Sequence, residues 1–550
     1  MQKGKQMRKR SSLSHRPVAK RSRLPDSHLI ALALLLAFSI FVETYFFYGP
    51  SQINAADNFL YTSIARNVAS SGTRVLMYGN SVFNSEYILI FGIAAFYELI
   101  GPGPLSFAMF GIVTFAGTVL VVYLIGNELY GRKAAMIAAL LYSFYPMAVI
   151  YGANVSDTGP MAFFAALSVL MMLFAYRRYG RLHHAKNSSN LRYAVIYMLS
   201  GMVAVLGLLI TAEGIIILLP ILAFLLIEAL VKKDRTVLEG FGYEIIGVLA
   251  GIALIALLST VVSGDPIHVF SSISGLYTSI QNMHGNLLSY LETMMPYTIS
   301  SPAVPINYNP DNYLSGYFLY AAIIAAAYLS FKRDKESILP LLWFIVTLLY
   351  LSYGTMSLFR YNIIQFATRY AILFAPAMVI LVGRAVQMFV GTKKRSKTRT
   401  DYMFIARLLI SIALIAVVFI QSIYLVWYLS ASEYESVYPF IQIGNYINSL
   451  PQNTHIVKPY NVYLSAYLNK GYDVTSIGIA DSSAVPKGAY LVGGNPQSFP
   501  NNCGIGSTSG LEEVFSPGFG NFRHFYLIPE HCNVYNLAVY INNPINNSTG

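Results

Sequence analysis

Eleven runs of apolar residues, each 17 to 26 residues long, constrain the fold of this chain more than any other feature. A helix needs about 20 mostly apolar residues to cross the roughly 30 Å of hydrocarbon in a bilayer. Charged residues make up only 11% of the chain, against about 25% in a typical soluble domain. The sequence therefore predicts an all-α polytopic membrane bundle. The expected spans are 29–48, 105–127, 134–152, 160–176, 193–211, 214–231, 237–262, 314–331, 337–353, 370–388 and 405–428.

One further apolar stretch, residues 86–100, is short and carries Glu86 and Glu98. We expect a juxtamembrane helix at the membrane interface there, and the positive charges test this choice. With the N-terminus in the cytoplasm and eleven spans, 29 of the 37 Lys and Arg residues fall on the cytoplasmic side. Such an excess is typical of cytoplasmic loops. A further span at 86–100 would turn the basic loops outward, so the charge pattern favours the interface helix.

This topology divides the chain into three parts and predicts a multi-pass protein of the plasma membrane. A basic cytoplasmic N-terminus (1–28) precedes a transmembrane domain (29–428) with outer loops 49–104 and 263–313, and an extracytoplasmic domain follows (429–550). Nine Lys and Arg residues in the first 25 resemble the start of a signal peptide. No small-residue cleavage site follows the first apolar run, which favours an uncleaved first span.

The C-terminal part has the pattern of a small α/β domain. A helix over 438–450 is expected, with strands within 454–460, 472–479, 489–494 and 525–529. Both cysteines of the chain, Cys503 and Cys532, lie here. A disulfide is chemically reasonable outside the cytoplasm, and two free thiols are the alternative.

Three carboxylates on the predicted outer side are candidates for chemistry, because acidic residues are scarce there. Asp57 lies in the first outer loop, Asp157 in the loop after the third span, and Glu213 at the turn between the fifth and sixth spans. A carboxylate near hydrocarbon is costly to desolvate and usually has a partner or a function. The alternatives are a helix cap or a solvated residue for Asp57, a helix cap for Asp157, and an interfacial residue for Glu213.

Arginines on the same side suit a phosphate group. Arg360 and Arg369 flank one outer loop, and Arg66 and Arg74 lie in the first outer loop. The planar guanidinium binds phosphate through two parallel hydrogen bonds. Snorkelling of a long side chain to the membrane interface is the alternative explanation.

Five segments, in this order, resemble the GT-C glycosyltransferases, and in particular the protein O-mannosyltransferases and the aminoarabinose transferases of lipid A. The first is Asp57-x-x-x-Tyr61-x-x-x-Ala65-Arg66 followed by Gly72. The others are 121–146, 151–167, 206–220 and 367–383. The resemblance covers most of residues 29–390 and implies a GT-C-like transmembrane domain.

The resemblance implies transfer of a sugar from a polyprenyl-phosphate donor to a protein, lipid or glycan hydroxyl at the outer membrane face. It implies a hexosyltransferase-type enzyme that inverts the anomeric carbon in a single displacement. The expected roles are catalysis by Asp57, as the base, and Asp157, donor-phosphate binding by Arg360, Arg369 and Arg66, and substrate binding by Tyr61, Glu86 and Glu213.

The chain departs from the family pattern at two places. Many relatives carry a second acidic residue where this chain has Asn58, and Lys or His and Pro where it has the stretch with Glu86. The WWDYG motif of oligosaccharyltransferases is absent, which argues against transfer of a whole glycan to Asn.

Two other functions fit the same sequence. A lipid-linked sugar flippase or transporter is one, although the charges of the predicted spans lie mainly at their ends, which disfavours proton coupling. A catalytically dead membrane scaffold is the other. We expect membrane lipids, the lipid-linked donor and the acceptor as partners, and no nucleic acid. The sequence has no nucleotide-binding motif, and we expect no cofactor; a divalent metal is compatible with the sequence, but nothing indicates one.

Overall fold

The computed structural model describes most of the transmembrane part and the strands of the C-terminal part. The described residues are 26–47, 56–73, 76, 82–101, 103–153, 155–183, 190–279, 318–355, 368–391, 402–451, 454–459, 473–477, 480–481, 486–494, 505–507, 512–515 and 537–541. Arg360, Cys503, Cys532 and the strand expected within 525–529 lie outside them.

Helices dominate the described chain. The α-helices are α1 (Asp26–Phe47), α2 (Ala56–Ser71), α3 (Tyr87–Ile100), α4 (Pro104–Tyr130), α5 (Arg132–Ser143), α6 (Pro146–Ala153), α7 (Thr158–His183), α8 (Asn190–Leu206), α9 (Leu218–Lys232), α10 (Arg235–Ser263), α11 (His268–Ser279), α13 (Phe318–Phe331), α14 (Ile338–Tyr353), α15 (Ala375–Val390) and α16 (Tyr402–Asn448). Five short 3₁₀ helices join them: η3 (Val82–Ser85), η4 (Gly207–Leu209), η5 (Ala212–Ile217), η7 (Lys335–Ser337) and η8 (Thr368–Leu373).

The described helices support a multi-pass membrane protein. Six segments among them are long and apolar enough to cross a membrane, and the bent pair of α5 and α6 makes a seventh if it counts as one span. Shorter apolar helices occupy the four other predicted spans, namely Leu29–Thr44, Phe318–Phe331, Ala375–Val390 and Phe404–Ile420. Each predicted span thus contains a helix, while the number of eleven crossings remains a prediction.

The predicted span 134–152 is broken. Helices α5 and α6 meet at an angle of 60°, and Pro146 begins α6. Proline lacks a backbone N–H and its ring clashes with the preceding turn, so it bends a helix that would otherwise run through. Ser143 Oγ, in the last turn of α5, lies 2.8 Å from Ser39 Oγ of α1 and joins the break to the first helix.

Helices α8 and α10 pack closely through glycine. A Cβ atom on Gly201 would lie 2.3 Å from the Glu244 carbonyl oxygen, and one on Gly247 would lie 2.0 Å from the Met198 carbonyl oxygen. At the same contact, Ser200 Oγ donates to Glu244 Oε1 at 2.8 Å. Small residues and interhelical hydrogen bonds hold membrane helices together in this way.

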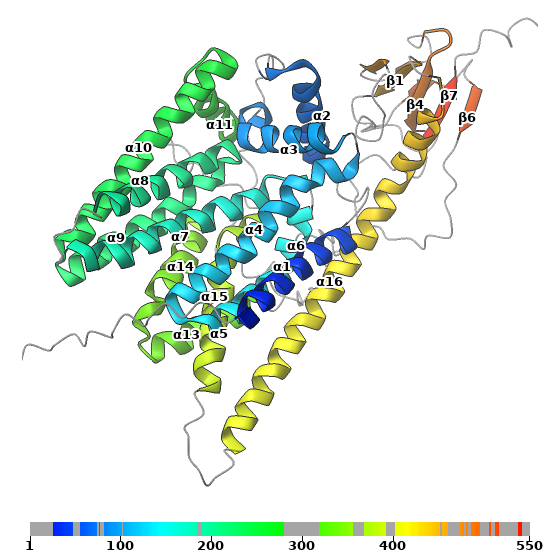
Figure 1. The fold of residues 1–550 in the computed structure, drawn as a ribbon. Coiled ribbons are helices and arrows are strands. Elements are labelled where there is room, and N and C mark those ends of the chain that lie inside the picture. The colour runs from blue at the N-terminus through cyan, green and yellow to red at the C-terminus, as the bar shows by residue number, and fades with distance from the viewer. Residues whose placement is uncertain are drawn as a thin grey trace, which may run out of the picture.

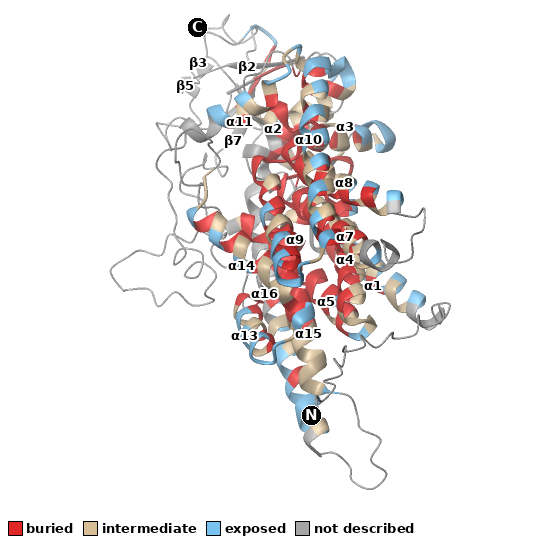
Figure 2. Cartoon of the chain, turned by 90° about the vertical axis from the view of Figure 1, so that its left-hand side faces the viewer, coloured by how far each residue is buried: buried red, intermediate tan, exposed pale blue. Residues whose placement is uncertain are grey.

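The buried core lies along the middle of the bundle (Figure 2). Apolar side chains also cover the outside of the bundle. On α10, Leu249 and Leu257 are each 60% exposed, and on α16 Ile420 is 67% exposed. Large exposed apolar surfaces are typical of proteins that contact membranes or partners. The pattern fits helices that face lipid.

Helices α2, α3 and α11 gather at one end of the bundle, beside the end of α10 (Figure 1). Helix α3 packs against both α2 and α4. It covers the stretch 86–100 that the sequence predicts as an interface helix, and it is 14 residues long. Its position relative to a membrane remains a prediction.

A mixed sheet lies at the far end of α16 (Figure 1). Its strands are β1 (His455–Pro459), β2 (Asp473–Ile477), β4 (Tyr490–Gly494), β6 (Glu512–Phe515) and β7 (Leu537–Ile541), in the order β2-β1-β4-β7-β6. Strand β1 pairs in parallel with β2 and β4, and β7 pairs antiparallel with β4 and β6. Strands β3 (Ala480–Asp481) and β5 (Ile505–Ser507) form a second, parallel pair. Three predicted strands are thus present, while a separate α/β domain remains a prediction because the helix expected at 438–450 is the end of α16.

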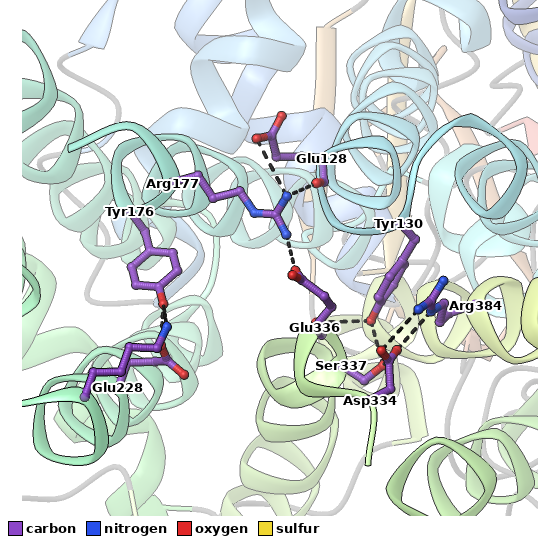
Figure 3. A network of polar contacts seen from close by, with 10 residues as sticks. Glu128, Tyr130, Tyr176, Arg177, Glu228, Asp334, Glu336, Ser337 and Arg384 are labelled. Carbon is purple, nitrogen blue, oxygen red and sulfur yellow. Dashed lines mark hydrogen bonds and ion pairs between the residues drawn. The ribbon is translucent and has the colours of Figure 1, made fainter. Parts of the chain in front are cut away.

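Polar contacts tie together the helix ends at the other end of the bundle (Figure 3). Arg384 of α15 donates to both carboxylate oxygens of Asp334, at 2.9 and 3.1 Å. Ser337 Oγ donates to Asp334 at 2.8 Å and receives a hydrogen bond from Tyr130 at 3.0 Å. Arg177 of α7 bridges the Glu128 carbonyl and the Glu336 carboxylate. These contacts join α4, α7 and α15 to the linker before α14.

We expect Asp334→Asn to lower the free energy of unfolding by about 1.5–3 kcal/mol near pH 7, the range for hydrogen bonds to charged groups. Burial opposes ionisation of Asp334, but the hydrogen bonds from Arg384 and Ser337 and the charge of Arg384 outweigh it and lower the pKa. Because the pKa of Asp334 is lower in the folded than in the unfolded protein, its ionised form stabilises the fold. This stabilisation is complete above the unfolded-state pKa of about 3.9, and it is lost as the pH falls from there through the lowered pKa of the folded protein.

Thermal unfolding of the purified protein between pH 3 and pH 7 measures this effect. The midpoint of the wild type should fall more steeply below pH 4 than that of the variant. Glu239→Gln is the matched control, because its partner Arg235 is 89% exposed and such surface pairs contribute little. Equal midpoints for Asp334→Asn and the wild type would contradict a stabilising role.

Candidate functional site

Asp157 lies at the start of α7, directly after the short helix α6. Its backbone carbonyl accepts a hydrogen bond from Met161 N at 3.0 Å, so its main chain occupies the helix-capping position. Asp157 as a whole is 6% exposed, and its carboxylate accepts a hydrogen bond from Thr158 Oγ1 at 3.0 Å. The backbone thus fits the capping alternative, whereas the carboxylate is buried inside the protein.

Glu213 lies in η5, at the turn where α8 gives way to α9. Its side chain is 2% exposed, and Thr211 Oγ1 donates to Glu213 Oε2 at 2.6 Å. Two glycines allow this turn to form: a Cβ atom on Gly214 would lie 2.6 Å from the Gly207 carbonyl oxygen. The turn holds a carboxylate inside the bundle.

Tyr370 connects these two carboxylates to Arg369. Its hydroxyl group donates a hydrogen bond to Glu213, and the charges of Asp157 and Arg369 both act on it. The guanidinium carbon of Arg369 lies 5.6 Å from the centre of the Tyr370 ring. Asp157, Glu213, Arg369 and Tyr370 thus form one group, which we call the carboxylate–arginine cluster. Arg369 is half-buried, and the other three residues are buried.

The cluster is held by three turns that pack together. Helix η8, which carries Arg369 and Tyr370, contacts α6, α7 and η5. Trp343 Nε1 of α14 donates to the Leu373 carbonyl at 2.9 Å and fixes the end of η8. A rigid backbone on all three sides places the charged side chains with little freedom.

A second polar group lies where α2, η3 and α3 meet. Tyr61 of α2 is 2% exposed and packs edge to face on Phe83, with ring centres 5.3 Å apart. Asn58 and Glu86 are also buried, at 3% and 4% exposure. Helix α3 then contacts η4, the turn that leads to Glu213. The two groups therefore lie on neighbouring elements.

The structure brings together three of the predicted site residues, namely Asp157, Glu213 and Arg369, as the cluster. Tyr61 and Glu86 belong to the second group, and Arg66 lies half-buried on α2. Asp57 is in the first turn of α2, but its side chain lies outside the described residues. Whether Asp57 meets Asp157 therefore remains a prediction.

Tyr370 is the residue of the cluster that the sequence did not single out as a site residue. The signal was its position next to Arg369 in the segment 367–383, which carries the family resemblance. Among the described residues, no group of three or more His, Cys, Asp and Glu side chains could hold a metal ion.

We expect Tyr370→Phe to lower kcat by about tenfold for the sugar transfer that the sequence resemblance implies, because it leaves the Glu213 carboxylate without the hydroxyl donor. One hydrogen bond to a charged group contributes about 1.5–3 kcal/mol, and 1.4 kcal/mol corresponds to a tenfold change in rate. Steady-state kinetics of the purified variant measures the effect. Tyr353→Phe, on an exposed part of α14, is the control, and equal kcat values for the two variants would remove Tyr370 from the site.

Membrane glycosyltransferases of the GT-C superfamily share this fold. ArnT of Cupriavidus metallidurans bound to undecaprenyl phosphate superposes with a TM-score of 0.57 at 15% identity, over 94% of this chain and 98% of that chain. The oligosaccharyltransferase of Archaeoglobus fulgidus in the apo form superposes with a TM-score of 0.52 at 14% identity, over 85% of this chain and 69% of that chain. The same enzyme, AglB, in complex with an inhibitory peptide and a dolichol-phosphate gives 0.52 at 15% identity with the same coverage.

Within this class, residues 88–263 match the family described as dolichyl-phosphate-mannose-protein mannosyltransferase. The match extends from α3 to the end of α10 and includes Asp157 and Glu213 of the cluster. No curated protein sequence matches the chain. The predicted resemblance to the GT-C superfamily is confirmed.

Proposed function

We propose that this protein is a glycosyltransferase that moves a sugar from a polyprenyl-phosphate donor to a hydroxyl group at the outer membrane face. The observation that carries the proposal is the carboxylate–arginine cluster, which places two buried carboxylates beside one arginine in a GT-C fold. Buried charges are costly and are kept where they are paired or functional. Bound polyprenyl phosphates in two solved relatives, ArnT and AglB, support the donor class.

In the proposed reaction, Asp57 accepts the proton of the acceptor hydroxyl as its oxygen attacks the anomeric carbon. The new glycosidic C–O bond forms while the bond between that carbon and the phosphate oxygen breaks. Polyprenyl phosphate leaves with the electron pair of that bond, and the anomeric carbon inverts. A positioned general base of this kind contributes about 10²- to 10⁴-fold to the rate.

Arginine stabilises the leaving group in this proposal. The phosphate gains negative charge as the bond to the sugar breaks, and a guanidinium group placed beforehand binds that charge. Arg369 is our first candidate, with Arg66 and Arg360 as further contacts. Asp157 and Glu213 hold Arg369 and Tyr370 in place, and with Tyr61 and Glu86 they also contact the sugar or the acceptor.

A hexosyl donor and a protein, lipid or glycan acceptor fit the family match, and they form part of this proposal. The expected location is the plasma membrane, with the N-terminus in the cytoplasm and the C-terminal part outside. The reaction as written needs no cofactor: the donor phosphate is already a good leaving group, so a carboxylate base and a cation from arginine supply what the transfer requires.

A flippase or transporter for lipid-linked sugars remains the second candidate. The sequence argument against it was that charges lie at the ends of the spans, but the structure buries Glu43 in α1 and Glu244 in α10, each at 0% exposure. Buried carboxylates inside spans are also typical of transporters. The two functions differ in chemistry, because transport leaves the sugar–phosphate bond intact.

The deciding experiment uses the full-length protein in liposomes with a panel of polyprenyl-phosphate sugars and hydroxyl acceptors. Release of polyprenyl phosphate that depends on the acceptor would support the transferase. Movement of an intact lipid-linked sugar between leaflets, without release, would support the transporter. A folded protein that neither transfers a sugar from any donor of the panel nor moves any of them between leaflets would favour the scaffold.

A further inference from the structure

Glu43 is buried in the bundle without a polar partner. It lies on α1, its side chain is 0% exposed, and neither carboxylate oxygen has a hydrogen-bond partner among the described residues. No described basic residue forms an ion pair with it. Buried polar groups are nearly always satisfied, so an unsatisfied carboxyl group inside a span calls for a functional explanation.

The Glu43 carboxyl group lies against the backbone of α6. A Cβ atom on Gly152 would lie 2.8 Å from Glu43 Oε1 and 3.0 Å from Phe115 Cβ. Because residue 152 is a glycine, its backbone leaves room for the carboxyl group at this position. Figure 1 shows α1 and α6 side by side, and the two helices contact each other.

The same stretch of α6 also contacts the turn that carries Asp157. A Cβ atom on Gly159 would lie 2.7 Å from the Tyr151 carbonyl oxygen and 3.3 Å from Gly152 Cα. Gly159 is in the first turn of α7, two residues after Asp157. Backbone contacts of this kind transmit small displacements, because packed interiors compress little.

Helix α6 is also suited to pivot. It is eight residues long and joins α5 through a 60° bend at the break between them. The direction of a short helix attached at such a break depends on the residues that pack against its sides. Glu43 and Gly159 both contact its last turn, at Gly152.

We propose that Glu43 is a positioning residue for Asp157: its carboxyl group holds α6 against the start of α7 through Gly152 and Gly159. This inference rests on the proposed function in one respect, because it assumes that Asp157 serves catalysis. The contact itself is a property of the fold. The role depends on the shape of the side chain, so Glu43→Gln should preserve it and Glu43→Ala should not.

The test combines hydrogen exchange with kinetics on the full-length protein in nanodiscs. Exchange in the peptide that covers 155–165 reports opening of the turn, because Met161 N–H donates to the Asp157 carbonyl. We expect Glu43→Ala to raise exchange there and lower kcat, each by about tenfold, with the KM for the donor changed less than twofold. Glu43→Gln should stay within twofold of the wild type in all three quantities.

A paired substitution tests the proposed route. Gly152→Ala alone places a methyl group against the Glu43 carboxyl group and should also raise exchange in the 155–165 peptide. Combined with Glu43→Ala, the methyl group enters the vacated space and should restore part of the loss. Gly126→Ala is the matched control, because its Cβ atom would lie 2.9 Å from Ala135 Cα, at the contact between α4 and α5; its effects should add to those of Glu43→Ala.

Two outcomes would overturn the positioning role. One is unchanged exchange in the 155–165 peptide of folded Glu43→Ala. The other is strict additivity of Glu43→Ala and Gly152→Ala. Both outcomes are measured by hydrogen exchange and need no catalytic activity. A wild-type protein that releases no polyprenyl phosphate would therefore contradict the proposed function, while hydrogen exchange would still decide this inference.

Discussion

Asp57→Asn should lower the rate of sugar transfer by about 10²- to 10⁴-fold while leaving the protein folded. The amide cannot accept the proton of the attacking hydroxyl group, and this is the range that a positioned general base contributes. The substitution keeps the size and shape of the side chain at the start of α2. Release of polyprenyl phosphate from the best donor of the panel measures the effect.

Asn67→Ala is the matched control, because Asn67 is exposed on the same helix. Its rate should stay within twofold of the wild type, and both variants should unfold at the temperature of the wild type within a few degrees. Full activity in Asp57→Asn would remove Asp57 from the mechanism. The base would then have to come from the cluster, where Asp157 is the first candidate.

Arg369→Gln should lower kcat by about 10²- to 10³-fold, the cost of removing one donor group aimed at developing charge. The same substitution leaves Asp157 and Glu213 close together without the neighbouring positive charge. Arg369→Lys keeps the charge but loses the planar fork that binds phosphate through two hydrogen bonds, so we expect an intermediate rate.

The lysine variant separates phosphate binding from snorkelling. A snorkelling arginine is replaced by lysine with little loss, because both carry an apolar stem and a charged end. Arg178→Gln is the control: Arg178 also stacks on an aromatic ring, 4.9 Å from the centre of Phe174, but it is exposed near the other end of α7. Wild-type kcat in both Arg369 variants would contradict a role in phosphate binding.

The two departures from the family pattern concern the choice of donor and do not involve residues of the carboxylate–arginine cluster. Asn58 and Glu86 are both buried in the second polar group, at the meeting point of α2, η3 and α3. At Asn58 an amide replaces the carboxylate of many relatives. Glu86 places a carboxylate in a stretch where many relatives carry basic residues. We therefore expect the difference between this chain and its relatives to appear first in the choice of donor.

The amino-acid sequence alone predicted the helices of the membrane part. Apolar length is a local property, so each predicted span contains a helix, and the two carboxylates in the short turns at Asp157 and Glu213 stood out by their scarcity. The break after α5 was within reach of the sequence, because Pro146 marks it, yet 134–152 was expected to be one span. The helix expected at 438–450 is present as the end of α16, but the sequence pattern does not show that α16 runs into it without a break from the membrane part.

Only the tertiary structure decided which of these residues meet. Glu213 and Tyr370 are 157 positions apart in the sequence, and their hydrogen bond depends on how η5 and η8 pack against α7. Glu43 stands in an apolar run whose sequence does not show which side of the helix faces the protein. Its position against Gly152 follows from the crossing of α1 and α6, because contacts between helices depend on packing and not on the local order of residues.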